Sequence, residues 1–222
     1  RSPASHVRVM VAAQSGSMAI MLYILRHGET EWNRSGRFQG QNNSPLTDRG
    51  KAQARAMGRL LRDRLEDTEH APISASPLGR TQQALEIVCE ELGRQPATAR
   101  NDKALMKICY GDWEGKTATE VALHDRAAHE LRYQDRLRNR VPNGESYLDI
   151  YHRAAAWLAG IELERETVVV AHGAFNRMLI AAACGHDPEL HLDTQTPQDA
   201  IYAATNGSYQ LVNTDYRDEE IT

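Results

Sequence analysis

Short apolar runs alternate along the chain with longer segments whose apolar residues recur at helical spacing. Residues 21–25 predict a short buried strand, and the β-branched run at 167–171 is typical of a central parallel strand. Between them, residues 51–65 carry apolar side chains three and four positions apart, which indicates an amphipathic helix. Because strands alternate with helices, the sequence predicts an α/β sandwich built on a largely parallel sheet.

The same patterns predict the remaining elements. Ser76 and Pro77 are expected to be the N-cap and the first residue of the helix that follows a short strand. In chain order these elements are a strand at 71–76, a helix from 77 to about 92, a charged helical region at 116–138, a helix that starts in "VPNGES" and runs through 158, a helix from 173 to about 184, and late strands at 200–203 and 209–212.

Length and composition narrow the class of protein. The 222 residues fit one compact core, and a net charge of −4 gives no general reason to bind nucleic acid or an anionic membrane. Three cysteines without a CxxC pair favour reduced thiols and a cytoplasmic location. No apolar stretch has the length of a membrane span. Any affinity for anions must therefore be local.

The chain begins without Met and carries "QSGSMAIM" before the first strand. We interpret residues 1–17 as the remnant of an expression vector or an upstream extension, and 18–222 as a single domain.

Two predicted strands end on histidine. Arg26, His27 and Gly28 follow the first strand, and His172 and Gly173 follow the late β-branched strand. Because the carboxyl ends of parallel strands meet at one edge of a sheet, both motifs are expected in the ligand crevice there. A third motif, "SPLGRTQQA", puts a cationic residue in the first turn of a helix that starts at the same edge.

Seven motifs in order carry a resemblance to a known family: "RHGETEWN", "RFQG", "SPLT", "SPLGRTQQA", "GDWEG", "NGES" and "VVVAHG". The chain resembles the histidine phosphatase superfamily, in the branch of phosphoglycerate mutase-like phosphatases. The resemblance implies a three-layer sandwich with helices on both faces of the sheet. It also implies a phosphomonoester hydrolase that acts through phosphohistidine on a small phosphorylated metabolite, without a cofactor or metal.

Matched residue by residue, the resemblance implies that His27 is the nucleophile. It places Arg26, Arg80 and a protonated His172 around the phosphoryl group, with Asn33 and Gly173 as further binding residues. These residue types suit the chemistry, because an imidazole can attack phosphorus and guanidinium groups hold phosphoryl oxygens through paired hydrogen bonds. The expected ligands are a small phosphorylated substrate or inorganic phosphate, and a homodimer is compatible with the sequence.

The general-acid motif departs from the family pattern. The family has a stretch like Leu-x-Glu shortly before the "GDWEG" element, but this chain reads "ALMKICYGDWEG", with Lys107 at the expected glutamate. An ammonium group with an ordinary pKa of about 10.4 gives up its proton reluctantly. Losing a general acid typically costs about 10²–10⁴ in rate. Three interpretations stay open: Lys107 is a cationic acid, the natural protein turns over weakly, or the substitution is engineered.

Other functions compete with the phosphatase. Lys107 alone suggests a phosphate-binding pseudoenzyme. A phosphoglycerate mutase is disfavoured because the mutases have "RHYG.LQG" and a longer insertion, whereas residues 116–142 are short here. The basic residues of that segment are interpreted as an exposed charged helix rather than the mouth of the site. A metal hydrolase lacks support, because the sequence has no HExxH motif.

Overall fold

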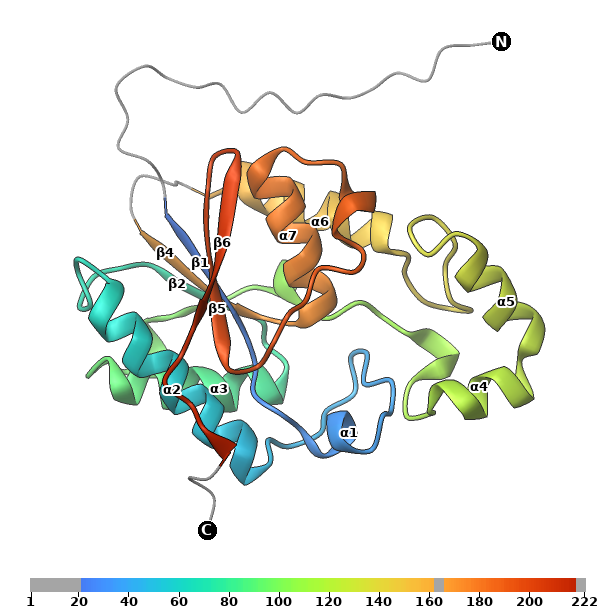
Figure 1. Ribbon diagram of the computed structural model, residues 1–222, viewed down its shortest axis with the longest axis horizontal. Helices are drawn as coiled ribbons and strands as arrows, with labels where there is room; N and C mark the ends of the chain where they lie inside the picture. The colour runs from blue at the N-terminus through green and yellow to red at the C-terminus, as the bar shows by residue number, and fades with distance from the viewer. Residues whose placement is uncertain (1–20, 162–165, 219–222) are drawn as a thin grey trace.

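One mixed sheet of six strands forms the centre of the molecule (Figure 1). The computed structural model describes residues 21–161 and 166–218, so the segment at 1–17 lies outside the described residues. The strand order is β3-β2-β4-β1-β5-β6. The strands are β1 (Leu22–Arg26), β2 (Ile73–Ala75), β3 (Arg100–Asn101), β4 (Thr167–Ala171), β5 (Ala200–Thr205) and β6 (Ser208–Asn213).

The sheet is mostly parallel, as predicted. β3, β2, β4 and β1 run in one direction, and β5 is antiparallel to both of its neighbours. The carboxyl ends of β1, β2 and β4 therefore lie at one edge. β1, β2 and β4 are short and buried on both faces, which explains their mostly apolar sequences, whereas the two residues of the edge strand β3 are polar and exposed.

Helices cover both faces of the sheet, which confirms the three-layer sandwich (Figure 1). α2 (Asp48–Arg64) and α3 (Gly79–Glu91) pack on one face, and α6 (Tyr147–Ala159) and α7 (Gly173–Cys184) on the other. Successive β1 side chains alternate between the two cores: Tyr23 and Leu25 face α2 and α3, whereas Leu22 and Ile24 face α6 and α7.

The remaining helices are short. α4 (Ala118–His124) and α5 (Arg126–Gln134) lie beside the sandwich, beyond the end of α1 (Glu31–Arg34) (Figure 1). The predicted helical region at 116–138 is thus two helices that meet at Asp125. The described residues also contain four 3-10 turns: η1 (Pro96–Thr98), η2 (Lys103–Leu105), η3 (Gly111–Trp113) and η4 (Pro188–His191). None of the helices in the described ranges is long and apolar enough to cross a bilayer.

The predicted N-cap at Ser76 is wrong. α3 begins at Gly79, and its N-cap residue Leu78 makes no side-chain cap. Ser76 instead continues the sheet, because its N–H donates to the carbonyl oxygen of Val170 at 3.0 Å. α2 also begins earlier than predicted, at Asp48, because the Thr47 hydroxyl accepts the N–H of Gly50 and caps the first turn.

Candidate active site

Three side chains meet where β1, β2 and β4 end. His27, Ser76 and His172 each follow the last residue of one of these strands. The ladder continues past β1, since the His27 N–H donates to the carbonyl oxygen of Ala171 at 3.2 Å. The two imidazole rings lie 5.2 Å apart, at an interplanar angle of 63°. The strand-end prediction therefore holds for the positions of both histidines.

His27 presents a free ring nitrogen. Its Nδ1 lies 2.8 Å from the carbonyl oxygen of Gly28, so Nδ1 carries the proton and donates it. The lone pair of the neutral ring is then on Nε2, which has no partner. Burial and the charges of Arg80 and Arg26 hold the pKa of His27 well below its usual value. A neutral imidazole with an unshared lone pair is suited to attack phosphorus.

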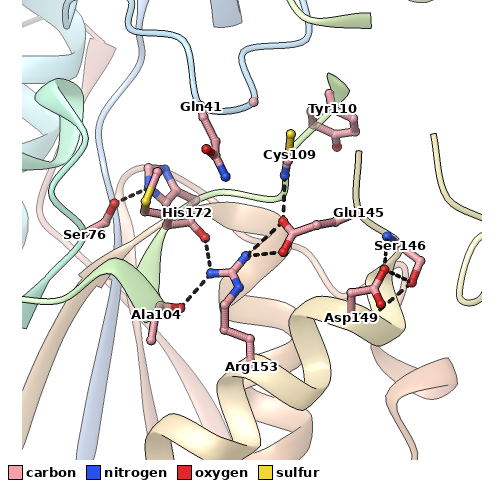
Figure 2. A network of polar contacts seen from close by, with 12 residues as sticks. Gln41, Ser76, Ala104, Cys109, Tyr110, Glu145, Ser146, Asp149, Arg153 and His172 are labelled. Atoms are coloured by element: carbon pink, nitrogen blue, oxygen red, sulfur yellow. Dashed lines mark hydrogen bonds and ion pairs between the residues drawn. The ribbon is translucent and has the colours of Figure 1, made fainter. Parts of the chain in front are cut away.

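Ser76 orients the second imidazole. Its Oγ lies 2.9 Å from Nε2 of His172 (Figure 2). Burial and the charge of Arg80 lower the pKa of His172 well below its usual value. His172, which the resemblance implied to be protonated, is therefore neutral unless an anion binds beside it. In the neutral ring, Ser76 donates to Nε2, and the proton sits on Nδ1, where it is free to bind an oxyanion.

Two guanidinium groups flank the histidines. Arg80 is fully buried and donates to the carbonyl oxygens of Asn42 at 2.7 Å and Gly40 at 2.8 Å. Half-buried Arg26 donates to the carbonyl oxygen of Thr196 at 2.7 Å. Burial lowers the pKa of each guanidinium to about 10, so both stay charged at neutral pH.

Unsatisfied buried nitrogen atoms mark the site. Among the described residues, eight buried side-chain polar atoms lack a hydrogen-bond partner. Four of them belong to this cluster: Nε of Arg26, Nε2 of His27, Nε of Arg80 and Nδ1 of His172. Buried polar groups are nearly always paired, so four orphans on four adjoining residues indicate a site for a ligand rich in oxygen atoms.

Glycines let the backbone come close around the histidines. A Cβ on Gly173 would lie 2.7 Å from Oγ1 of Thr196 and 3.3 Å from Nε of Arg26. A Cβ on Gly28 would lie 2.0 Å from the carbonyl oxygen of Gly50, which cannot yield easily because it is backbone. Gly173 thus contributes by leaving room for Arg26 at the amino end of α7.

Asn33 reaches the site only through another residue. Its Oδ1 accepts hydrogen bonds from the N–H and Oγ1 of Thr30, which makes it part of the capping box of α1. The same oxygen accepts from Nε2 of Gln198 at 3.0 Å, and Gln198 also donates to the carbonyl oxygen of His27 at 3.4 Å. Gln198 therefore joins Asn33 to the backbone of His27.

Lys107 lies on a loop whose backbone is anchored by the ion pair between Glu145 and Arg153. Glu145 accepts the N–H of Cys109 at 2.8 Å and pairs with Arg153 at 3.1 Å (Figure 2). Arg153 also donates to the carbonyl oxygens of Ala104 and Met106, both at 2.7 Å. The helix that follows is capped by Ser146 rather than by Glu145. These contacts fix both sides of Lys107, which is itself half-buried.

A second carboxylate, Glu114, binds the backbone of the loop that accepts the hydrogen bonds of Arg80. Glu114 accepts the backbone N–H groups of Gln41 at 2.9 Å, Asn42 at 3.2 Å and Tyr110 at 3.1 Å. With its oxygens so engaged, Glu114 holds the loop whose carbonyl groups accept from Arg80.

The basic segment at 116–142 is not uniformly exposed. Arg132, predicted to lie on a solvated helix, is 4% exposed, and its guanidinium lies 5.3 Å from the centre of the Tyr147 ring. Arg136 donates to the carbonyl oxygen of Leu192 and pairs with Asp193. Tertiary packing against α6 turns part of the charged segment inward.

Replacing Arg153 with methionine is expected to destabilise the protein by about 2–3 kcal/mol, because it strands a half-buried carboxylate and two carbonyl oxygens. Guanidinium chloride unfolding measures this loss. Arg140→Met is the control: Arg140 pairs with Asp149 at 2.6 Å, but its side chain is 67% exposed, so the loss should stay below about 1 kcal/mol. Equal losses in the two variants would contradict the anchoring role of Arg153.

Stability should fall as the pH drops below about 6.5, the usual imidazole pKa. The folded pKa values of His27 and His172 lie well below those of the unfolded chain. The unfolded state therefore binds more protons, and stability rises with pH in this window. Each histidine contributes up to about 1.4 kcal/mol per pH unit. Denaturant unfolding at pH 5 to 8 measures how the free energy of unfolding changes with pH, and this slope should be shallower for His172→Gln than for the unmodified chain. His124→Gln is the control and should keep the slope of the unmodified chain, because the exposed ring of His124 is unrelated to the site.

Comparison with known proteins supplies the family. The sequence profile described as the histidine phosphatase superfamily, branch 1, matches residues 22–215. The chain belongs to this superfamily. The "Probable phosphoglycerate mutase GpmB" of Serratia proteamaculans is 30% identical over 169 residues, which is 75% of each chain. Among solved structures, Bacillus stearothermophilus YhfR is 30% identical with a TM-score of 0.71, covering 88% of this chain and 96% of that one.

The Shigella flexneri alpha-ribazole phosphatase has the same fold at lower identity. It superimposes with a TM-score of 0.75 at 23% identity, covering 88% of this chain and 96% of that chain. Family membership confirms the resemblance inferred from the seven motifs and identifies the chain as an enzyme of the histidine phosphatase type.

Several residues of this histidine phosphatase escaped prediction. Ser76 was assigned to a helix cap, and Gln198 lies in an irregular segment with no motif. Arg177, whose charge acts on Arg26, lies four residues after Gly173 in α7. That i to i+4 spacing from a site residue is the signal that could have revealed it.

Proposed function

We propose that this histidine phosphatase hydrolyses a small phosphorylated metabolite through a phosphohistidine intermediate on His27. The observation that carries the proposal is the set of four unpartnered buried nitrogens on Arg26, His27, Arg80 and His172. One lone pair and three N–H donors are what a phosphoryl group in transfer needs, since its charge is spread over three oxygens. The two guanidinium groups supply fixed positive charge, so the proposed reaction uses no metal.

The steps follow from the tautomers. Nε2 of His27 attacks phosphorus, and the bond from phosphorus to the leaving oxygen breaks with its electron pair on that oxygen, which takes up a proton from solvent to give the alcohol. The proton stays on Nδ1, which donates it to the Gly28 carbonyl oxygen, so the phosphorylated ring is cationic and remains a good leaving group. Water then attacks phosphorus, the bond between phosphorus and nitrogen breaks, and inorganic phosphate leaves while the water proton passes to phosphate or solvent.

Rapid quenching tests the intermediate. With p-nitrophenyl phosphate, an alkaline quench should yield a phosphorylated peptide that contains His27 and loses its phosphate in acid. The first turnover should release p-nitrophenolate in a burst no larger than the enzyme concentration. Phosphate binding without a burst or a phosphopeptide would overturn the proposal in favour of a phosphate-binding pseudoenzyme.

A phosphoglycerate mutase is the second candidate, because the Serratia relative carries that name. The short segment between the "GDWEG" and "NGES" motifs favours a phosphatase. Conversion of 3-phosphoglycerate to 2-phosphoglycerate that requires 2,3-bisphosphoglycerate would support the mutase instead.

A further inference from the structure

Lys107 lies among cations rather than beside a carboxylate. Burial and the charges of Arg26, Arg80 and Arg177 lower the pKa of its amine well below the usual value. Its Nζ lies 6.0 Å from the centre of the Tyr110 ring, and it forms no ion pair in the part of the chain that the structure describes. Holding an unpaired cation in a half-buried position costs folding free energy, and a bound anion would offset that cost.

The cationic side chains continue from Lys107 toward a small cavity. Arg177 donates from Nε to the carbonyl oxygen of Thr194 at 2.8 Å and from Nη1 to the Tyr147 hydroxyl at 3.2 Å. The guanidinium of Arg132 lies over the ring of the same tyrosine, 5.3 Å from the ring centre. Neither arginine forms an ion pair with a described carboxylate. The cavity holds about 90 Å³ and is lined by Phe38, Tyr110, Trp113, Arg132, Arg136 and Tyr147.

One phosphoryl group does not use all of these charges. Arg26, Arg80 and His172 already supply three free donors for its three oxygens. Lys107 and Arg177 then remain without an anionic partner. Glu114 acts on Arg80, but its oxygens are engaged by three backbone N–H groups. The positive charge in excess of one phosphoryl group points to a substrate with a second anionic group beside the first.

The chemistry of the leaving group identifies that second anion. An alkoxide must be protonated as it leaves, and by the motif resemblance Lys107 stands at the position of the carboxylic acid that would perform this step. A phosphate monoester that is itself the leaving group can depart as a dianion and needs no such proton, because the second pKa of a phosphate monoester is only about 6. We propose that the preferred substrate is a terminal diphosphate, whose leaving group is itself a phosphate bound by Lys107 and Arg177. This inference rests on the proposed phosphohistidine step and extends it from monoesters to phosphoanhydrides.

The reaction balances without an acid. Nε2 of His27 bonds to the terminal phosphorus, and the bridging P–O bond breaks with both electrons on the oxygen of the inner phosphate. That phosphate departs as an anion paired with Lys107. Water then cleaves the bond between phosphorus and nitrogen, which regenerates His27 and gives inorganic phosphate. The net reaction consumes one water molecule per diphosphate.

Three substrates separate the effects: inorganic pyrophosphate, p-nitrophenyl phosphate and glycerol 2-phosphate, each assayed for kcat/KM with the whole chain. The chain itself should prefer pyrophosphate to glycerol 2-phosphate by at least about 10²-fold, since only the alkoxide needs a proton. In Lys107→Gln, the ratio of pyrophosphate to p-nitrophenyl phosphate should fall at least about 30-fold, because one preorganised charge is worth about 10²–10³ in rate. Lys107→Arg should restore most of the ratio.

Lys103→Gln is the matched control, since Lys103 is exposed four residues earlier on the same segment and should leave the ratio unchanged. Thermal unfolding checks that each variant is folded. A pyrophosphate preference that is absent, or that persists in Lys107→Gln, overturns the diphosphate assignment even if p-nitrophenyl phosphate still phosphorylates His27. Failure of all three substrates to phosphorylate His27 would remove the proposed function itself.

Discussion

Replacing His27 with alanine is expected to lower kcat/KM for p-nitrophenyl phosphate by at least about 10⁴-fold, because the covalent route disappears while only binding and electrostatic stabilisation remain. The neighbouring His172 cannot substitute. The other imidazole, His172, has one nitrogen engaged with Ser76, and its free Nδ1 carries a proton rather than a lone pair. Steady-state assays with the burst phase measured in parallel test this expectation.

The variant should still bind the phosphoryl group. Arg26 and Arg80 keep their contacts to carbonyl groups of Thr196, Gly40 and Asn42, none of which involves the His27 ring. Inorganic phosphate should therefore raise the melting temperature of His27→Ala as it does for the unmodified chain. His124→Ala serves as the control and should retain full activity, because the His124 ring is exposed on α4. Turnover by His27→Ala within tenfold of the unmodified chain would show that another group attacks phosphorus.

The sequence locates the histidines well because their placement follows from strand polarity. β1 and β4 are recognisable as short apolar runs, and parallel pairing brings their carboxyl ends together without further information. The β1 motif and the β4 motif are separated by more than a hundred residues, yet the register of the two strands pairs Arg26 with Ala171 and so places His27 beside His172. Local sequence and sheet topology are sufficient here.

The parts that escaped prediction depend on irregular backbone and long-range packing. Arg80 is held by carbonyl groups of Gly40 and Asn42, which no periodic pattern specifies. Ser76 satisfies the rule for a helix cap, but its partner is a histidine 96 positions away in the chain. A hydroxyl near a predicted helix start has two competing uses, and only the fold decides between them.

Arg132 shows that the exposure of a charged residue also depends on long-range packing. Its segment reads as a solvated helix because acidic and basic residues alternate. In the fold, the guanidinium packs against the ring of Tyr147 at the start of α6 and donates to the carbonyl oxygen of Arg136. A charge pattern indicates solvent exposure by default, and an aromatic partner from a distant element reverses it.

Lys107→Glu should raise kcat/KM for glycerol 2-phosphate by about 10²–10⁴, the usual contribution of a general acid. The loop is already fixed on both sides of the residue by Arg153, whose bonds to Ala104 and Met106 do not involve the Lys107 side chain. A carboxyl group there would lie among Arg26, Arg80 and Arg177, which favour its ionised form until a phosphoryl dianion offsets their charge. The gain should therefore be largest at acidic pH, and the pH profile of kcat/KM measures it.

The same substitution separates two explanations of Lys107. If the lysine only disables an otherwise ordinary monoesterase, the glutamate variant gains on glycerol 2-phosphate and keeps its activity on pyrophosphate. If the lysine binds a leaving phosphate, the gain on the alkyl ester is accompanied by a loss on pyrophosphate, because a carboxylate repels the departing dianion. Lys103→Glu makes the same change of charge at an exposed position and should do neither. A crossed change in the two substrates, seen only at Lys107, is the outcome that the surrounding cations predict.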